Sequence, residues 1–286
     1  MPTNKKQHYL PQVYLRQWAA GCEEAGGKKH TWRIGKESCC LASLRDQCQK
    51  PYFYSKESKS ICERYFQNIE DRFAEIARKL TGNIELSKQD FFALFVFGMD
   101  LYIRNHRSAT SPGNEEFEYY LKRTEIFKKQ LILGSGDVDS DEEVKNIIWR
   151  HWDFRVIRMP ESHKLLTCDS PSILLGSSEV PERILGLMYP LSPSSFFVGV
   201  DSRVYALSRE YSLDSDFEIM NYNTFEQASH SVYSKRDFSG CNLAKYASII
   251  GQRDKSEWID GWQIELIDYD RNPNISFIGE KHNPES

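Results

Sequence analysis

The stretch HYLPQVYLRQW, residues 8–18, places an imidazole, two tyrosines, a proline, an arginine and a tryptophan among aliphatic side chains near the start of the chain. Disordered arms are polar and repetitive, so this composition predicts a segment that packs into the fold. Pro11 suits the first turn of a helix, where its missing N–H is not needed. We therefore expect a short helix between the helical and strand-rich parts of the chain, with His8 and Tyr9 held just before it.

The composition is that of a folded globular protein, because 40% of the 286 residues are hydrophobic and 13% are aromatic. The net charge of -4 arises from 41 acidic and 37 basic residues, so no overall field favours nucleic acid or an anionic membrane. The chain has neither an apolar run of about 18 residues nor a secretory signal. These features predict a soluble, cytoplasmic protein with no membrane partner.

Several classes of enzyme lack their signatures here. The seven cysteines form no C-x-x-C pair, which indicates a reducing compartment and provides no zinc framework. The chain has no P-loop and none of the G-x-G-x-x-G, G-x-S-x-G and H-E-x-x-H patterns. Their absence argues against nucleotide triphosphatases, dinucleotide oxidoreductases, ordinary serine hydrolases and zinc proteases.

Two helices are predicted from local patterns in the first half. Apolar residues recur at three- and four-residue spacing across 58–80 and form one stripe, with Glu70 at its edge. Ser87 and Asp90 then have the spacing of a capping box. The helix that they begin, over 91–103, is apolar almost all round, which predicts a place at the centre of the fold.

This buried helix would deliver Arg104 and Arg107 together near its carboxyl end. A third, more polar helix is expected over about 115–133. The acidic run 137–143 lacks the glycine and distal glutamate of an EF-hand loop, and we expect it to lead into a shorter helix.

Beyond Trp152 the sequence becomes strand-like. The expected elements are strands at 154–159, 164–168, 172–175 and 196–200, a turn-rich segment at 189–193, helices at 217–233 and about 242–249, and a closing strand at 262–267. A further short strand is expected at 30–34. No internal repeat or long low-complexity linker is present.

These elements predict a single α+β domain over 1–286. Its helical amino-terminal half, about 1–150, would pack on a mixed or antiparallel sheet with helices in the carboxyl-terminal half, about 151–271. The last residues, 272–286, have the composition of a frayed tail.

Motifs spread over nearly the whole chain resemble an uncharacterised bacterial family, the domain of unknown function 4238. The matching pieces are His8-Tyr9 with Pro11, Leu15 and Trp18; Ile69-Glu70; Arg104; Thr167 to Pro171; Tyr189 to Ser192; and Asn221 or Asn223. Cys168 and Ser170 depart from the more usual Ser-Asp-Asn-Pro form of that turn. The resemblance implies one intact domain and no established activity.

The polar residues among these motifs have the composition of an active site. A titratable base, carboxylates, a cation and an amide would serve proton transfer, charge stabilisation and ligand orientation. We predict His8, Glu70, Arg104 and Asp169 as catalytic residues. The predicted substrate-binding residues are Tyr9, Gln12, Arg107, Asn221 and Asn223. No metal site is predicted, because the spacing gives no specific support for a divalent ion bound by His8, Glu70 and Asp169.

The residue types favour hydrolysis or transfer at a phosphate or glycosidic centre, since the two arginines would bind an anionic group while His8 moved a proton. The first hypothesis is a nuclease-like hydrolase of a phosphodiester or other phosphate-containing substrate, with nucleic acid or a nucleotide as partner, acting in bacterial conflict or phage defence. The alternative is a non-enzymatic sensor or interaction module with a protein partner.

That alternative has a structural basis for each residue. His8 would bond a backbone carbonyl, and Glu70 with Arg104 would form an ion pair between helices. Asp169 would form a turn before Ser170-Pro171, and the asparagines would cap or bond locally.

Overall fold

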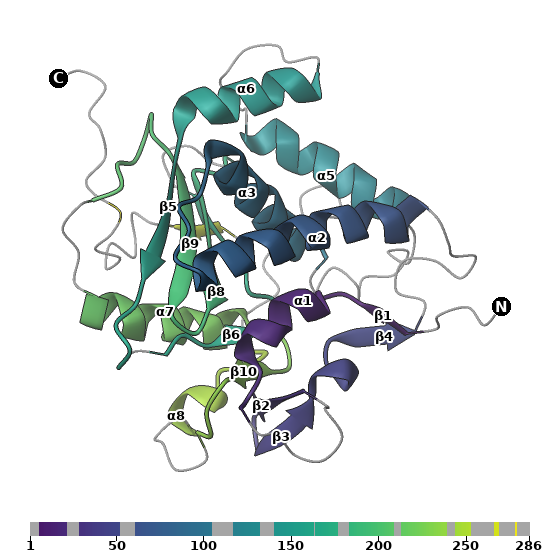
Figure 1. Cartoon of the computed structure of the whole chain (residues 1–286), viewed down its shortest axis with the longest axis vertical. Coiled ribbons are helices and arrows are strands. Elements are labelled where there is room, and N and C mark those ends of the chain that lie inside the picture. Colours follow the sequence, from purple (N-terminus) through teal and green to yellow (C-terminus); the bar gives the residue numbers. More distant parts are fainter. Residues whose placement is uncertain are drawn as a thin grey trace.

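The computed structural model describes residues 6–21, 29–51, 61–104, 117–131, 140–162, 164–176, 183–208, 213–238, 244–252, 266–268 and 278. They form an α+β fold, as predicted (Figure 1). The helices are α1 (Gln12–Leu15), η1 (Arg16–Trp18), η2 (Leu44–Asp46), α2 (Ile61–Thr81), α3 (Lys88–Ile103), α5 (Phe117–Leu131), α6 (Asp141–His151), α7 (Leu213–Gln227) and α8 (Ala244–Ala247). The strands are β1 (Lys6–His8), β2 (His30–Ile34), β3 (Cys39–Ser43), β4 (Gln49–Pro51), β5 (Trp152–Arg158), β6 (Thr167–Cys168), β7 (Ile173–Gly176), β8 (Gly186–Ser192), β9 (Ser195–Asp201), β10 (Val232–Ser234) and β11 (Leu266–Asp268).

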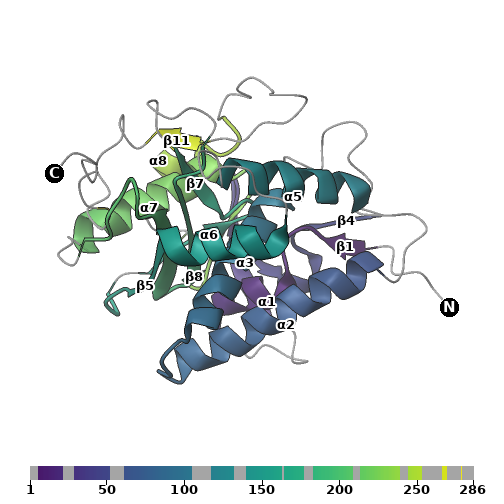
Figure 2. The same ribbon diagram turned by 90° about the horizontal axis from the view of Figure 1, so that it is seen from above.

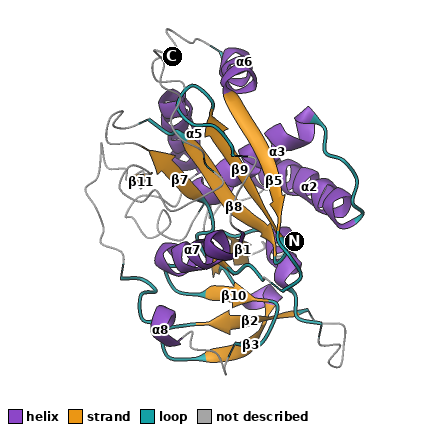
Figure 3. Cartoon of the chain, turned by 90° about the vertical axis from the view of Figure 1, so that its left-hand side faces the viewer, coloured by secondary structure: helices purple, strands orange, loops and turns teal. Residues whose placement is uncertain are grey.

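The described strands form three sheets (Figure 3). The largest has the order β11-β7-β8-β9-β5, in which β11 runs parallel to β7 and the other neighbours are antiparallel. A four-stranded antiparallel sheet has the order β3-β2-β10-β6, and β1 pairs with β4. The largest sheet is therefore mixed and the second is antiparallel.

The amino-terminal half is less purely helical than predicted. The strand expected at 30–34 is confirmed as β2, but it belongs to a sheet whose other members come from both halves of the chain. Its antiparallel partner β10 places Tyr233 opposite Arg33. Strand pairing between segments so far apart in sequence leaves no local pattern, so the division into two halves missed it.

Two predictions in the second half are wrong. The segment 189–193, expected to be turn-rich, lies mostly in β8, where Pro190 is accommodated at an irregularity in the pairing with β9. The helix expected at 217–233 is α7, which ends at Gln227. Ser229 and His230 instead donate their backbone N–H groups to Asp169, and the chain continues into β10.

The other long elements agree with the sequence pattern. The helices expected at 58–80, 91–103 and 115–133 correspond to α2, α3 and α5, and the helix after the acidic run is α6. The strands expected at 154–159, 172–175 and 196–200 correspond to β5, β7 and β9. The predictions for Arg107 and for the tail 272–286 fall outside the described residues, except for Ile278.

Helices cover both faces of the five-stranded sheet. Alternate residues of a strand point to opposite faces. Leu187 and Tyr189 therefore pack in one core with residues of α2 and α3, whereas Met188 packs in a second core with Met220 of α7. Figure 1 shows α2 and α3 on one side of β5, β8 and β9.

The segment 8–18 lies between the helices and the sheets, as expected, and contacts both. The Tyr14 hydroxyl donates to the Pro190 carbonyl at 2.8 Å and bonds the Thr167 hydroxyl at 2.7 Å. Its ring packs against aromatic rings of α2 and α3. The Trp18 indole donates to the Leu165 carbonyl at 3.0 Å. Figure 2 shows the resulting position of α1, alongside α2 and near α3.

Gly98 allows α3 to lie directly on β8. A Cβ atom at this position would lie 2.5 Å from Cε1 of Tyr189 and 2.8 Å from Cδ2 of Leu187. The Tyr189 ring cannot easily move away, because its hydroxyl donates to the Leu94 carbonyl at 2.7 Å. The close approach of helix and strand therefore depends on the absence of a side chain at Gly98.

We expect Gly98→Ala to lower the free energy of unfolding by about 2 kcal/mol, because the steric cost in a packed core exceeds the gain in helix propensity. Gly35→Ala is the matched control, since its new Cβ meets atoms only at 3.8 Å or beyond. Urea denaturation of both variants measures the difference. Equal stability of the two would contradict the packing argument.

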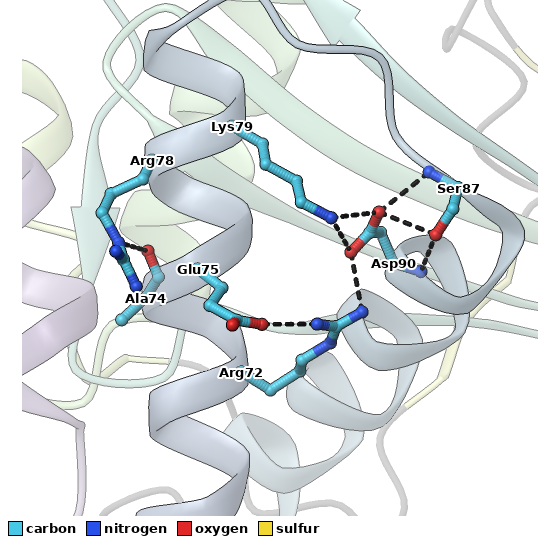
Figure 4. Close-up of polar contacts among 7 residues, drawn as sticks. All are labelled: Arg72, Ala74, Glu75, Arg78, Lys79, Ser87 and Asp90. Carbon is cyan, nitrogen blue, oxygen red and sulfur yellow. Dashed lines mark hydrogen bonds and ion pairs between the residues drawn. The ribbon is translucent and has the colours of Figure 1, made fainter.

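The predicted capping box at the start of α3 is present and is extended by ion pairs (Figure 4). The Ser87 hydroxyl accepts from the Asp90 amide at 3.2 Å, and an Asp90 oxygen accepts from the Ser87 amide at 2.8 Å. Lys79 of α2 donates to the same carboxylate at a shortest distance of 2.8 Å, and Arg72 of α2 donates to it at 2.9 Å. One buried carboxylate therefore holds the two helices together.

These contacts control the protonation of Asp90. Burial disfavours its charged form, but the bonds from Lys79 and Ser87 outweigh burial and lower its pKa to about 2 from the usual 3.8. A carboxyl group whose pKa is lower in the folded state than in the unfolded state stabilises the fold at pH values above its unfolded pKa. That contribution, about 2 kcal/mol, is lost as the pH falls from about 4 towards 2.

Asp90→Asn should therefore lower the free energy of unfolding by about 2 kcal/mol at pH 7, and the difference from wild type should shrink between pH 4 and pH 2. Glu143→Gln is the control, because Glu143 occupies the same place in the exposed capping box of α6. Its effect should stay within about 0.5 kcal/mol. A pH-independent difference for Asp90→Asn would rule out the carboxylate as its source.

Candidate functional site

Arg104 joins three segments of the chain. It follows α3 directly, and its side chain is 3% exposed. Its Nη1 donates to Oε1 of Glu70 on α2 at 3.1 Å and to Oδ2 of Asp100 at 3.0 Å. Its Nη2 donates to the backbone carbonyl of His8 in β1 at 2.9 Å. The guanidinium therefore fixes β1 relative to α2 and α3.

Three residues that the sequence analysis missed complete this cluster. Asp100 is almost fully buried and accepts a hydrogen bond from the Tyr120 hydroxyl at 2.9 Å. The Arg104 guanidinium carbon lies 4.2 Å from the centroid of the Phe66 ring, a cation–π contact. Asp100 was detectable, because it is a carboxylate four residues before Arg104 in an otherwise apolar helix. We call Glu70, Asp100, Arg104, Tyr120 and Phe66 the Arg104 cluster.

The Arg104 cluster contains two carboxyl groups and one guanidinium. Burial raises the pKa of Glu70, and Asp100 raises it further, whereas Arg104 acts in the opposite direction. Burial also raises the pKa of Asp100 against the effect of Arg104. Only Glu70 reaches solvent, with 23% of its side chain exposed. It is therefore the carboxyl of this cluster that can exchange protons at the surface.

The His8 ring is oriented by two neighbours. Its Nδ1 lies 3.1 Å from the Gln47 carbonyl, which only accepts, so this nitrogen carries the hydrogen. Nε2 then accepts from the side-chain amide of Gln12 at 3.0 Å. The ring is partly buried. The structural role expected for His8, a bond to a backbone carbonyl, is present, and Nε2 keeps the character of a base.

Asp169 lies in a different network. It is 1% exposed, and its two oxygens accept the backbone N–H groups of Ser229 and His230, each at 2.8 Å. Burial raises its pKa despite these bonds. The carboxylate therefore holds the segment between α7 and β10, and it is not at an accessible surface.

Tyr9 connects this second network to the first. Burial raises its pKa, with further contributions from Cys48 and Asp169, so the phenol stays protonated. The Cys48 thiol lies 3.2 Å from the Tyr233 hydroxyl, and burial also raises the pKa of this thiol. Because Tyr9 follows His8 directly, the two networks meet at the start of the chain.

The remaining predicted site residues are dispersed. Asn221 accepts from the Leu166 amide at 2.8 Å and donates to the Lys164 carbonyl at 3.4 Å, so it holds the entry to β6. Asn223 is buried in α7. Arg107 lies outside the described residues. The structure thus brings His8, Gln12, Glu70 and Arg104 together and places Asp169 and the asparagines elsewhere.

The described residues contain neither a candidate metal site nor a membrane-spanning helix. Within these ranges no group of three or more His, Cys, Asp or Glu side chains could hold a metal ion. None of the described helices is long and apolar enough to span a membrane.

The fold and the Arg104 cluster define an α+β protein in which a buried arginine joins the amino-terminal strand to two helices. Residues 6–238 match the family model described as "Protein of unknown function (DUF4238)", and the chain belongs to this family. The resemblance found in the sequence is thereby confirmed. No match was found among curated proteins or among solved structures.

We expect Arg104→Gln to lower the free energy of unfolding by about 3 kcal/mol, because it leaves the buried Asp100 and the partly buried Glu70 without their cation. Arg78→Gln is the control, since Arg78 is exposed and bonds only a carbonyl of its own helix among its described contacts. Its effect should be within about 0.5 kcal/mol. Similar values for the two variants in urea denaturation would show that the Arg104 cluster is not a structural crosslink.

Proposed function

We propose that the chain is a nuclease-like hydrolase that acts on a phosphodiester or another phosphate-containing substrate, with His8 and Glu70 as its acid–base pair. The supporting observation is that Arg104 holds both, Glu70 by its carboxylate and His8 by its backbone carbonyl. Both side chains are only partly buried. In a bacterial cell this activity would suit an effector of conflict or phage defence.

His8 serves as the general base in this proposal. The hydrogen on Nδ1 is held by the Gln47 carbonyl, which leaves the lone pair of Nε2 to accept a proton. Gln12 now occupies that position at 3.0 Å. A water molecule or a substrate hydroxyl would take the place of the Gln12 amide.

Glu70 serves as the general acid. Its raised pKa, caused by burial, favours the protonated form that can donate to a leaving oxygen. Arg104 and Asp100 are positioning residues, because their hydrogen bonds are made within the fold. Phosphate binding therefore falls to other groups, of which the predicted Arg107 is one.

The second proposed function is a non-enzymatic sensor or interaction module. It is favoured by the burial of Arg104 and Asp169, because each uses its hydrogen-bonding groups to hold the backbone. In this case His8 and Glu70 belong to the same structural network, and a protein partner binds elsewhere on the surface.

The test is cleavage of labelled RNA and DNA, with and without divalent metal ions, by wild type, His8→Asn and Glu70→Gln. Asparagine retains a donor near the position of Nδ1 and removes Nε2, and glutamine retains an acceptor for Arg104. We expect each variant to fold normally and to lose activity by about 100-fold or more, the usual contribution of a general acid or base.

Unchanged nucleic acid in every wild-type reaction would reject nucleic acid as the substrate and favour the interaction module. Cleavage by both variants at the wild-type rate would instead show that another site performs the reaction. Far-ultraviolet circular dichroism of each variant separates loss of chemistry from loss of fold.

A further inference from the structure

A cluster of basic side chains lies where β5 begins and β9 ends. Trp152 and Asp201 are direct partners in the pairing of these strands. Arg150 and His151 end α6 immediately before β5, and Arg203 follows β9. Arg183, which precedes β8, completes the set. We call Arg150, His151, Arg183, Asp201 and Arg203 the Asp201 cluster.

Asp201 organises two of these arginines. Its side chain is fully buried. Oδ1 accepts from the amide and from Nε of Arg203, at 3.0 Å and 2.9 Å, and Oδ2 accepts from Nη2 of Arg203 at 2.8 Å. Oδ2 also accepts from Nη2 of Arg183. These charge-assisted bonds lower the pKa of Asp201 despite its burial, so the carboxylate stays ionised.

Among the described residues, the cluster has more arginines than carboxylates. Arg183 and Arg203 share the Asp201 carboxylate. Burial lowers the pKa of His151, and Arg150, Arg183 and Arg203 all act in the same direction. Asp153 does not compensate, because alternation along β5 directs it to the face opposite Trp152 and Asp201. One guanidinium is enough to neutralise the Asp201 carboxylate. This carboxylate therefore does not also neutralise the second guanidinium.

The cluster also has a hydrogen-bond donor without a described acceptor. Nε of Arg183 is buried and has no partner among the residues that the structure describes. A buried donor without an acceptor carries a free-energy cost that an added acceptor removes. The arginines remain reachable, since 12% of the Arg183 side chain and 27% of the Arg203 side chain are exposed.

We infer that the Asp201 cluster is a binding site for a phosphate group, with Arg183 as its principal donor and with Arg203, Arg150 and His151 around it. Guanidinium groups bind phosphate through paired N–H donors, and Asp201 fixes two of them in place. The helix dipole favours basic residues at the end of α6 and so accounts for Arg150 and His151, but for no other residue of the cluster. Arg183 and Arg203 lie on other segments.

This site uses none of the residues proposed for hydrolysis. The bound phosphate group belongs to a free ion, to a monoester or to the backbone of a nucleic acid. Hydrogen bonds from the guanidinium groups recognise all three in the same way. Binding is therefore measured separately from cleavage, and either result stands without the other.

The test is to titrate the full chain separately with inorganic phosphate, adenosine monophosphate and a single-stranded oligonucleotide. Nuclear magnetic resonance signals of the His151 imidazole report binding in each titration. We expect phosphate to shift the His151 signals and to raise the pKa of this ring. Arg150→Gln should weaken binding two- to fivefold, about the effect of one exposed charge pair. Arg158→Gln, at the other end of β5, should leave binding unchanged.

The three probes distinguish the source of the phosphate. Tightest binding of the oligonucleotide, with affinity that falls steeply as salt increases, identifies a nucleic-acid backbone. Tightest binding of the ion or the mononucleotide identifies a free or terminal phosphate. The inference is overturned if no probe shifts the His151 signals, or if Arg158→Gln weakens binding as much as Arg150→Gln.

Discussion

The buried hydroxyl of Tyr14 is the contact on which the arrangement of the molecule depends. It bonds Thr167 and the carbonyl of Pro190, and so joins a four-residue helix to strands of both larger sheets. The same ring packs against aromatic residues of α2 and α3. A hydroxyl buried in an aromatic core needs a hydrogen-bond partner, because an unsatisfied hydroxyl would be unfavourable there. The Tyr14 contacts, together with the Trp18–Leu165 and Arg104–His8 hydrogen bonds, therefore position the amino-terminal segment.

Local patterns in the sequence predicted the parts of the fold that local interactions determine. The apolar periodicity of α2, the apolar character of α3 and the Ser87–Asp90 capping box act within a few turns of helix, and each is observed. The pairing of β2 with β10 joins residues about two hundred positions apart, and no short window contains it. Pro190 was read as a turn residue, because its place at a strand irregularity depends on the neighbouring β9.

The candidate site was predictable to a similar extent. Glu70 and Arg104 stood out because each adjoins an apolar stretch, and the structure joins them. Asp100 was overlooked inside the apolar run, although its spacing from Arg104 is the helical one. Asp169 has a buried role that only the fold reveals, since its partners are backbone amides about sixty residues away. Sequence identifies unusual side chains better than it identifies what faces them.

The short strand β11 has a consequence for self-association. It lies beyond the segment matched by the family model and pairs in parallel with β7, a strand whose four residues are all buried. A bare edge of this kind offers its peptide groups to any other extended chain and is a common starting point for aggregation. Among the described strands, β11 occupies this edge with three residues, Leu266–Asp268. The peptide groups of β7 on that side are therefore already paired along β11 and are not offered to another chain.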